Sequence, residues 1–376
     1  MREIEGSIFS HINLGSDEKD KRDKVDVGST DPLLVENFIE MVKKVAILSF
    51  HNKDHLLFFR GQEKDHLNRN NNSSFYPSIY RTKNGENLSK ELLNIRFKLL
   101  DQASALLVKK FEEYEILDSV KELKRRKFIQ WSILQHYEVC DTPLLDLTQS
   151  LRVACSFALQ KKQKTGYVFV FGLPYITNRI TINSEQDIVN IRLINICPPQ
   201  ALRPYFQEGN LVGTADILND YDERIELDFK RRLIAKFKIS NGNEFWGDQD
   251  SLEKYLMPDG DQVQALCQEI KDALKEENNI AAMFPGKWLN EYELKDGRKG
   301  KEIIEIKKGN QYYTQGRHYF NLESVSIDRA NGIIKFRKVS ATGDNRKAFN
   351  TLKIESDNRY VGTETNGTKI SYTRIE

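Results

Sequence analysis

Leu56-Leu57-Phe58-Phe59-Arg60-Gly61-Gln62 is the stretch that decides how the first part of this chain folds. Its four consecutive apolar residues are typical of a β-strand, and they end directly at Arg60. We therefore predict a strand that leaves the hydrophobic core and carries an arginine at its tip. A guanidinium group has two parallel N–H donors that match the oxygens of a phosphate or carboxylate, and Gly61 would let a ligand approach the backbone closely. The alternative is an arginine that pairs with a structural carboxylate.

The chain around this stretch has 376 residues, of which 39% are hydrophobic and 30% are charged. Such a composition is typical of a globular protein with a hydrophobic core, and the length predicts two domains or three small ones. The net charge of +2 provides no global attraction to nucleic acid or to an acidic membrane. No apolar run approaches the ~20 residues of a membrane-spanning helix, and the N-terminus lacks the features of a signal peptide. We therefore expect a soluble, cytoplasmic protein without a membrane partner.

Four cysteines are scattered along the chain, and no two of them form a Cys-x-x-Cys pair. We interpret them as reduced, buried, small apolar residues. No cluster of cysteine and histidine has the spacing of zinc ligands, so no metal site is predicted. The cysteines are Cys140, Cys155, Cys197 and Cys267.

Helical and extended patterns alternate unevenly up to about residue 278, which favours an α+β fold over a regular βαβ repeat. The basic stretch 121–127 starts one predicted helix, and we interpret it as a solvated helix face, with a nucleic-acid contact as the weaker alternative. The predicted helices are 33–48, 89–115, 121–138, 151–160 and 261–277, and the predicted strands include 167–171, 191–196 and 233–239.

From Gly286 onward the pattern changes to short alternating segments separated by turn residues. Asp296-Gly297, Asn331-Gly332 and Asn366-Gly367 are strong signals for tight hairpins. Eight short strands in succession predict a small antiparallel barrel or sandwich. The candidate strands are 287–294, 302–307, 311–315, 318–324, 333–339, 349–354, 359–364 and 369–375.

Two further polar segments lie beside apolar ones in the first part of the chain. Thr148 and Ser150 are two positions apart on a predicted strand end, so both hydroxyls would point the same way, unless they cap the helix that follows. His136 is either a partly buried structural histidine or a functional group. The third segment, Arg203 to Val212, combines aromatic residues with Gln207 and Glu208, and it suits ligand recognition or a strand bulge.

Taken in order, these segments resemble the FRG domain, which is named for its Phe/Tyr-Arg-Gly motif. The resemblance covers about residues 45–275, although Leu144 stands where an arginine is often found. The matching segments are Phe59-Arg60-Gly61-Gln62, Tyr76-Pro77-Ser78-Ile79-Tyr80-Arg81, Gln135-His136-Tyr137, 144–158, Phe206-Gln207-Glu208-Gly209 and Leu256-Met257-Pro258-Asp259.

The same order of motifs is more distantly similar to ADP-ribosyltransferases of the Arg-Ser-Glu type. This resemblance implies that Arg60 holds a phosphate or ribose of NAD, assisted by Gly61, Gln62 and Arg81. It implies that Thr148 and Ser150 orient the nicotinamide ribose. It also implies that His136 binds a ribose hydroxyl or transfers a proton. Glu208 would be the catalytic acid, because a fixed carboxylate stabilises the positive charge that develops on the ribose.

The sequence leaves open whether Gln207 or Glu208 faces the pocket at this place. FRG domains favour glutamine at this place, which is Gln207 here, and a glutamine binds but supplies no negative charge. On a strand, Gln207 and Glu208 would face opposite ways. Either Glu208 is catalytic, or Gln207 faces the pocket and the activity is different or absent.

We therefore expect one of two functions. The first is an NAD-consuming enzyme, an ADP-ribosyltransferase or NAD glycohydrolase, as found in toxins and antiviral defence. The second is a non-enzymatic FRG module that senses a nucleotide. The acceptor of any ADP-ribose and the oligomeric state stay open.

The C-terminal segment carries a signal of its own. Gly286-Lys287-Trp288 and Arg374 resemble the lipocalin-like (calycin) arrangement, in which a tryptophan packs under an arginine that closes the barrel through a cation–π contact. A barrel of this size holds one small ligand or none. The predicted organisation is a polar arm at 1–30, an FRG domain at 31–278 and a barrel at 284–376.

Overall fold

The computed structural model describes residues 1–4, 8–14, 26–82, 88, 90–160, 164–216, 224–240, 243–247, 255–279, 286–307, 311–328, 332–342, 346–356 and 358–375. Its contacts divide the chain into two compact units. The front unit comprises Met1–Arg81 and Leu106–Cys267, and the barrel unit comprises Thr82–Ala105 and Gln268–Glu376. No helix in the described ranges is both long and apolar enough to cross a membrane.

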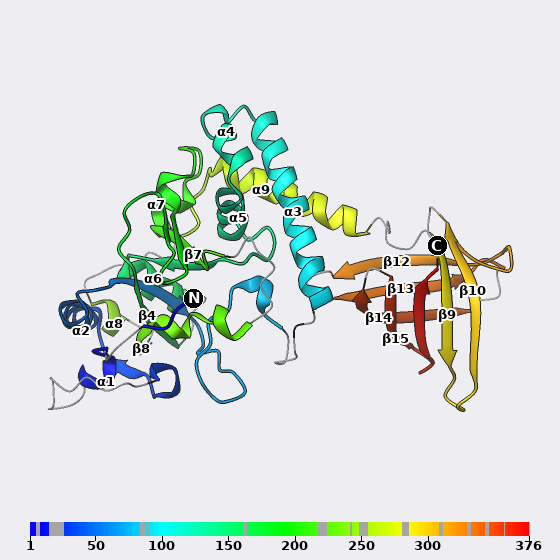
Figure 1. Ribbon diagram of the computed structural model, residues 1–376, viewed down its shortest axis with the longest axis horizontal. Helices are drawn as coiled ribbons and strands as arrows, with labels where there is room; N and C mark the ends of the chain where they lie inside the picture. The colour runs from blue at the N-terminus through cyan, green and yellow to red at the C-terminus, as the bar shows by residue number, and fades with distance from the viewer. Residues whose placement is uncertain are drawn as a thin grey trace. The chain divides into compact units, whose positions relative to one another are not determined.

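A mixed eight-stranded sheet forms the centre of the front unit (Figure 1). Its pairings are antiparallel except for the parallel pair at one edge, β1 with β8. This arrangement confirms the predicted mixture of helices and sheet. The strands run in the order β1 (Leu33–Val35), β8 (Leu233–Ser240), β4 (Thr165–Leu173), β2 (Leu56–Gln62), β3 (Leu145–Thr148), β7 (Gly209–Gly213), β6 (Ile188–Arg192) and β5 (Ile180–Asn183).

Two predicted helices differ from the structure. The helix predicted at 33–48 begins later, because Leu33–Val35 pairs with β8 and the side chain of Asn37 caps α2 (Phe38–His51). The helix predicted at 121–138 is two helices, α4 (Leu117–Arg125) and α5 (Lys127–His136), because Arg126 between them has an extended backbone. The other helices are α1 (His11–Leu14), α3 (Lys90–Glu113), α6 (Leu151–Ala158), α7 (Arg203–Gln207), α8 (Asn243–Trp246) and α9 (Gln262–Asn279), and the unit boundaries fall inside α3 and α9.

The sheet of the front unit is apolar on both faces. Phe58 and Phe59 are consecutive on β2 and belong to two different core clusters, as the alternation of a strand requires. One cluster includes α6, and the other gathers Phe75, Phe169 and Phe171 with edge-to-face ring contacts. The segment predicted as a polar arm also contributes to this core, because Ile4 and Phe9 are buried in it, while residues 5–7 and 15–25 lie outside the described residues.

Helix α6 lies unusually close to the sheet, and Gly61 is the reason. A Cβ atom at Gly61 would be 1.8 Å from the carbonyl oxygen of Ala154, and one at Gly166 would be 2.2 Å from that of Ala158. Both contacts are with the backbone of α6, so neither glycine can be replaced without moving the helix. The sequence-based explanation for Gly61, room for a ligand, is therefore incomplete, since helix packing already requires the glycine.

The barrel unit contains a closed antiparallel barrel, which settles the choice between barrel and sandwich. The predicted hairpin glycines Gly297, Gly332 and Gly367 all have positive φ, while Asn331 lies outside the described residues. Trp288 is fully buried, and the guanidinium carbon of Arg374 lies 4.6 Å from its ring centroid, which confirms the expected cation–π contact. The strands are β9 (Gly286–Glu293), β10 (Lys299–Lys307), β11 (Gln311–Thr314), β12 (Arg317–Asp328), β13 (Ile333–Ser340), β14 (Lys347–Ser356), β15 (Arg359–Glu364) and β16 (Lys369–Arg374).

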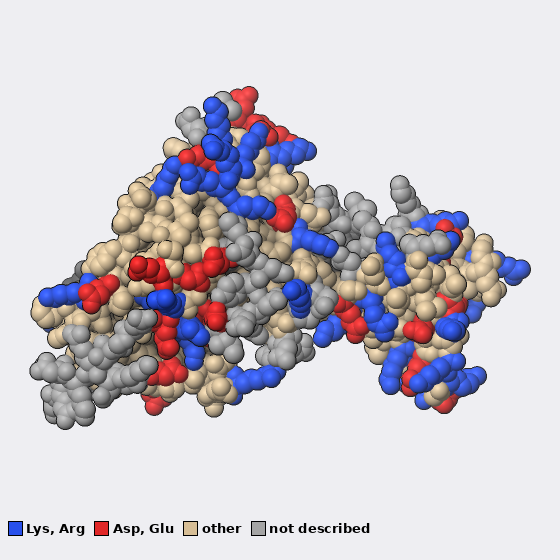
Figure 2. Space-filling view, in the orientation of Figure 1, with Lys and Arg blue, Asp and Glu red and all other residues tan. Residues whose placement is uncertain are grey.

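The basic stretch at α4 is interleaved with acids. Lys124 pairs with Glu112, and Glu122 pairs with Arg179. Figure 2 shows Lys and Arg side chains gathered over α4, with acidic side chains among them. This arrangement is typical of a solvated, salt-bridged helix surface.

Candidate functional site

A cavity of about 340 Å³ opens in the front unit at the end of β2. Strand β3 and helices α5, α6 and α7 complete its walls. Six of the residues singled out from the sequence line it: Arg60, Gly61, Arg81, His136, Thr148 and Gln207. The other lining residues are Phe59, Gln135, Glu138, Asp146, Leu147, Phe157, Arg203 and Gly209.

Arg60 extends across the neighbouring strand. Its Nη1 donates a hydrogen bond to the backbone carbonyl of Asp146 (2.6 Å), while its Nε is buried and has no hydrogen-bond partner in the described part of the chain. Burial and the nearby charge of Arg81 lower the pKa of Arg60 to about 10, so the guanidinium stays protonated at neutral pH. A buried donor without a partner costs free energy, and a ligand oxygen would recover it.

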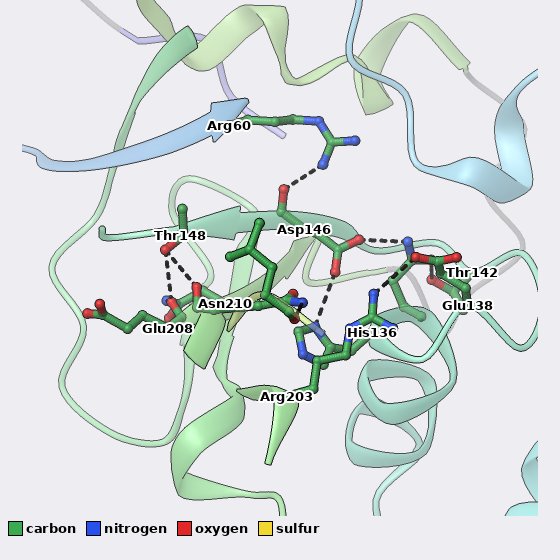
Figure 3. Close-up of polar contacts among 12 residues, drawn as sticks. Arg60, His136, Glu138, Thr142, Asp146, Thr148, Arg203, Glu208 and Asn210 are labelled. Carbon is green, nitrogen blue, oxygen red and sulfur yellow. Dashed lines mark hydrogen bonds and ion pairs between the residues drawn. The ribbon is translucent and has the colours of Figure 1, made fainter. Parts of the chain in front are cut away.

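Asp146 is the centre of a polar network beneath Arg60 (Figure 3). Its Oδ2 accepts a hydrogen bond from Gln135 Nε2 (2.7 Å), and Gln135 Oε1 accepts one from the Thr142 hydroxyl (2.6 Å). Nδ1 of His136 lies 3.8 Å from Asp146 Oδ1, too far for a hydrogen bond but close enough for an electrostatic contact. The network fixes the Asp146 carboxylate at the floor of the cavity.

The charge states of Asp146 and His136 follow from their burial and from the charged groups near them. Burial alone would raise the pKa of Asp146, but the contact with His136 and the charge of Arg60 outweigh it, so the pKa lies below its usual value. Burial lowers the pKa of His136, more than Asp146 raises it. At neutral pH the site therefore combines an ionised aspartate with a neutral imidazole, whose Nε2 is buried and has no partner among the described residues.

Arg203 begins the helix on the opposite wall. Its Nη2 donates to Glu138 Oε1 (3.0 Å), and its backbone N–H donates to the carboxylate of Asp261 (2.8 Å). The charges of Arg203 and Glu138 therefore compensate each other. Arg60, Arg81 and Asp146 line the same cavity as this ion pair.

The structure gives Gln207 and Glu208, the two residues of which the sequence left open which one faces the pocket, different environments. Gln207 is buried, lines the cavity and donates its Nε2 to the carbonyl of Leu256 (2.6 Å). Glu208 is exposed and does not line the cavity, and Figure 3 shows its side chain pointing away from Asp146 and Arg60. The expected strand is wrong here: Gln207 ends α7, and Glu208 adopts the left-handed conformation (φ 46°, ψ 43°) before β7.

Thr148 and Ser150 have structural hydrogen bonds. The Thr148 hydroxyl donates toward the carbonyls of Gln207 (3.0 Å) and Glu208 (3.2 Å) and accepts from the backbone N–H of Ser150 (3.0 Å). Ser150 caps α6, which confirms that alternative for this residue. Gln62 and Ser150 are not among the cavity-lining residues, and a role for either in ligand binding stays a prediction.

Four polar lining residues received no role from the sequence: Gln135, Glu138, Asp146 and Arg203. Asp146 had a usable signal, because it lies between Leu145 and Leu147 on a strand, and alternation places it on the opposite face from both. Gln135 and Arg203 had no such signal, since their contacts depend on how α5 and α7 pack.

We expect the front unit to lose stability as the pH falls below about 6.5, the pKa of an unfolded histidine. Burial lowers the pKa of His136, His11, His55 and His66, so below that pH the unfolded chain binds more protons than the folded one. Thermal unfolding followed between pH 7.5 and 5.5 would measure the effect. His136→Gln should make the dependence shallower, and an unchanged pH profile in this variant would contradict the contribution of His136.

Comparisons with known proteins match a family model to part of the front unit and about a quarter of the chain to designed barrels. Five chains of solved structures are similar to this chain, whereas no curated protein matches it. A redesigned beta barrel is 17% identical (TM-score 0.20, 26% of this chain and 96% of that one). A de novo designed fluorescence-activating beta barrel is 18% identical (TM-score 0.20, 26% and 97%). Residues 55–166, which carry Arg60, Arg81, His136 and Asp146, match the FRG domain.

Proposed function

We propose that the front unit binds a phosphate-bearing nucleotide, NAD among them, in the Arg60 cavity. The observation that carries the proposal is the buried Nε of Arg60, which lacks a partner among the described residues, with Arg81 lining the same cavity. Two guanidinium groups suit a phosphate better than an apolar ligand, because charged hydrogen bonds to phosphate are strong and geometrically specific. The volume of about 340 Å³ is in the range of small-molecule sites.

Binding without turnover is the function that this geometry supports best. The acid expected from the resemblance to ADP-ribosyltransferases, Glu208, is exposed and outside the cavity, and the neutral Gln207 lines it instead. A glutamine amide can orient a ribose or a carboxamide, but it offers no negative charge to a developing cation.

Hydrolysis of NAD is the second candidate, and Asp146 is the observation that favours it. Its carboxylate lies on the cavity wall, is ionised, and is held in place by Gln135. A fixed carboxylate of this kind can stabilise an oxocarbenium-like ribose while nicotinamide leaves. Water would then attack the ribose carbon, and its proton would go to a neutral base such as His136.

Arg60→Ala is expected to weaken nucleotide binding about 10- to 100-fold, because a charge-assisted hydrogen bond contributes about 1.5–3 kcal/mol. Calorimetric titration of the full chain with ADP and with NAD measures the change. Arg192→Ala is the matched control, because Arg192 is exposed on β6 and lies outside the cavity lining. Equal losses in both variants, or no saturable binding by the unmodified protein, would refute the proposal.

Turnover is tested separately, by following the release of nicotinamide from NAD. If hydrolysis occurs, we expect Asp146→Asn to lower kcat by at least about 100-fold, as for the loss of other electrostatic stabilisers, and Glu208→Ala to leave it unchanged. The reverse pattern would return the catalytic role to Glu208. Binding that persists without release would leave a nucleotide-binding module.

A further inference from the structure

The interior of the barrel unit is divided into an apolar half and a polar half. Trp288, Ile306, Ile334 and Ile354 belong to the apolar core cluster. The polar half contains a cavity of about 580 Å³, whose walls include Asn290, Glu302, Tyr312, Lys338 and Glu364. These five residues come from five different strands, so the closed barrel itself assembles the site.

We propose that this cavity binds a small, flat molecule with a positively charged nitrogen, and that Glu302 and Asn290 accept hydrogen bonds from it. The proposal is independent of the nucleotide site, because it concerns the other unit. It rests on the charges, the buried polar atoms and the aromatic rings of the cavity wall.

Lys338 is a buried cation on the cavity wall, and its charge is already compensated. Its side chain is buried, and its Nζ lies 3.0 Å from Glu364 Oε1. Aromatic rings surround the ammonium group, with the centroids of Tyr312 and Tyr372 at 5.1 and 5.5 Å. A carboxylate and two ring faces are the partners that a buried ammonium group needs, so Lys338 does not require an anionic ligand.

Glu302, in contrast, has a negative charge without a cation. Its Oε1 accepts hydrogen bonds from Asn290 Nδ2 (3.0 Å) and from the Tyr312 hydroxyl (3.1 Å), both of which are neutral donors. No ion pair to Glu302 is present among the residues that the structure describes. Among the described residues that line the cavity, Glu364 is matched to Lys338, and Glu302 is a carboxylate without an ion pair.

Asn290 supplies a second acceptor beside this carboxylate. The side chain is 4% exposed, and its Oδ1 has no hydrogen-bond donor in the described ranges. A buried acceptor in this state costs free energy until a donor arrives. An N–H group that reaches Glu302 lies close to Asn290 as well, since Asn290 Nδ2 contacts the same carboxylate.

Aromatic rings limit the shape of the ligand. Tyr312 and Phe320 line the cavity and pack edge to face, with centroids 5.6 Å apart, and Tyr292 lines it as well. Rings of this kind favour a flat body, and their faces attract a cation. Arg346 and Lys347 also line the cavity, which makes an anionic ligand the alternative that an experiment must exclude.

Three probes of similar shape and different charge separate the alternatives: benzamidine (cationic), benzamide (neutral) and benzoate (anionic). Each is titrated into the full chain, and binding is measured by ligand-detected NMR. We expect benzamidine to bind at least about tenfold more tightly than benzamide, since a charged hydrogen bond is roughly twice as strong as a neutral one. Benzoate that binds more tightly than benzamidine, or no benzamidine binding up to about 10 mM, would overturn the proposal.

Variants locate the binding in the barrel. Glu302→Gln should weaken benzamidine binding about tenfold, and Ala348→Leu should weaken it by filling the cavity. Glu323→Gln is the matched control, because Glu323 is exposed on β12 and does not line the cavity. Hydrogen exchange of the barrel strands shows whether each variant is folded. Equal benzamidine affinity in the folded Glu302→Gln and Glu323→Gln proteins would refute the role of Glu302.

Discussion

Alanine at position 61 is expected to unfold the front unit. The added Cβ would lie 1.8 Å from the carbonyl oxygen of Ala154 and 2.7 Å from the backbone nitrogen of Ala158. Both atoms belong to the backbone of α6, so the clash cannot be relieved by rotating a side chain. Helix α6 packs equally closely on the neighbouring strand β4, because a Cβ at Gly166 would lie 2.2 Å from the carbonyl oxygen of Ala158. The helix would have to leave the sheet, at a cost above ~4 kcal/mol, which is a large part of the stability of a typical domain.

Hydrogen–deuterium exchange read by mass spectrometry assigns the loss to one unit. In Gly61→Ala, strands β2 and β4 should lose protection, while the barrel strands keep theirs. Gly260→Ala is the control, since Gly260 has a φ of +79° and no atom within 4 Å of an added Cβ. It should cost only about 1–2 kcal/mol, the strain of a left-handed residue. A stable Gly61→Ala protein with normal protection in β2 would show that α6 can move away at little cost.

Gly61 also shows what the sequence could and could not reveal about the site. The apolar run 56–59 predicted strand β2 and placed Arg60 at a pocket, and both features are present. The reason for the glycine could not be predicted, because it depends on how closely α6 approaches, and α6 follows β2 by about ninety residues in the chain. A glycine that admits a helix and one that admits a ligand look the same in a sequence.

The sequence left the choice between Gln207 and Glu208 open for a different reason. Alternation was applied to a segment that was assumed to be a strand, whereas Arg203–Gln207 is a helix with Pro204 at its start. Proline in the first turn is a known sign of a helix start, and it was present in the sequence. The left-handed residue that turns Glu208 outward has no comparable sign, since it is not a glycine.

The barrel was more predictable than the front unit, because its contacts are local. Each strand pairs with a sequence neighbour, apart from the closing pair of β9 and β16. Turn residues and alternation therefore determine most of the register. Alternation also places Lys338 on the same face as Ile334 and Phe336, inside the barrel. The pairing with Glu364 on β15 and the aromatic rings around the ammonium group explain why a lysine is tolerated there.

Trp288→Ala is expected to destabilise the barrel by about 3–5 kcal/mol, as for other fully buried aromatic residues. The indole is completely buried, and its centroid lies 5.1 Å from that of the Tyr360 ring. The guanidinium carbon of Arg374 lies 4.6 Å from the indole centroid. Loss of the ring would leave a cavity at the apolar end, where strand β9 closes the barrel against β16. Phe349→Ala is the control, because this ring is large but 54% exposed on β14.

A double-mutant cycle separates the packing of the indole from its contact with Arg374. Arg374→Met retains an apolar side chain of similar length but removes the charge, and it should cost about 0.5–2 kcal/mol in the presence of Trp288. In the Trp288→Ala background the same substitution should cost less, because no ring is left to attract the guanidinium. Chemical denaturation, with exchange of the barrel strands as the local readout, gives both values. Equal costs in the two backgrounds would mean that Arg374 stabilises the barrel through its other contacts and not through the indole.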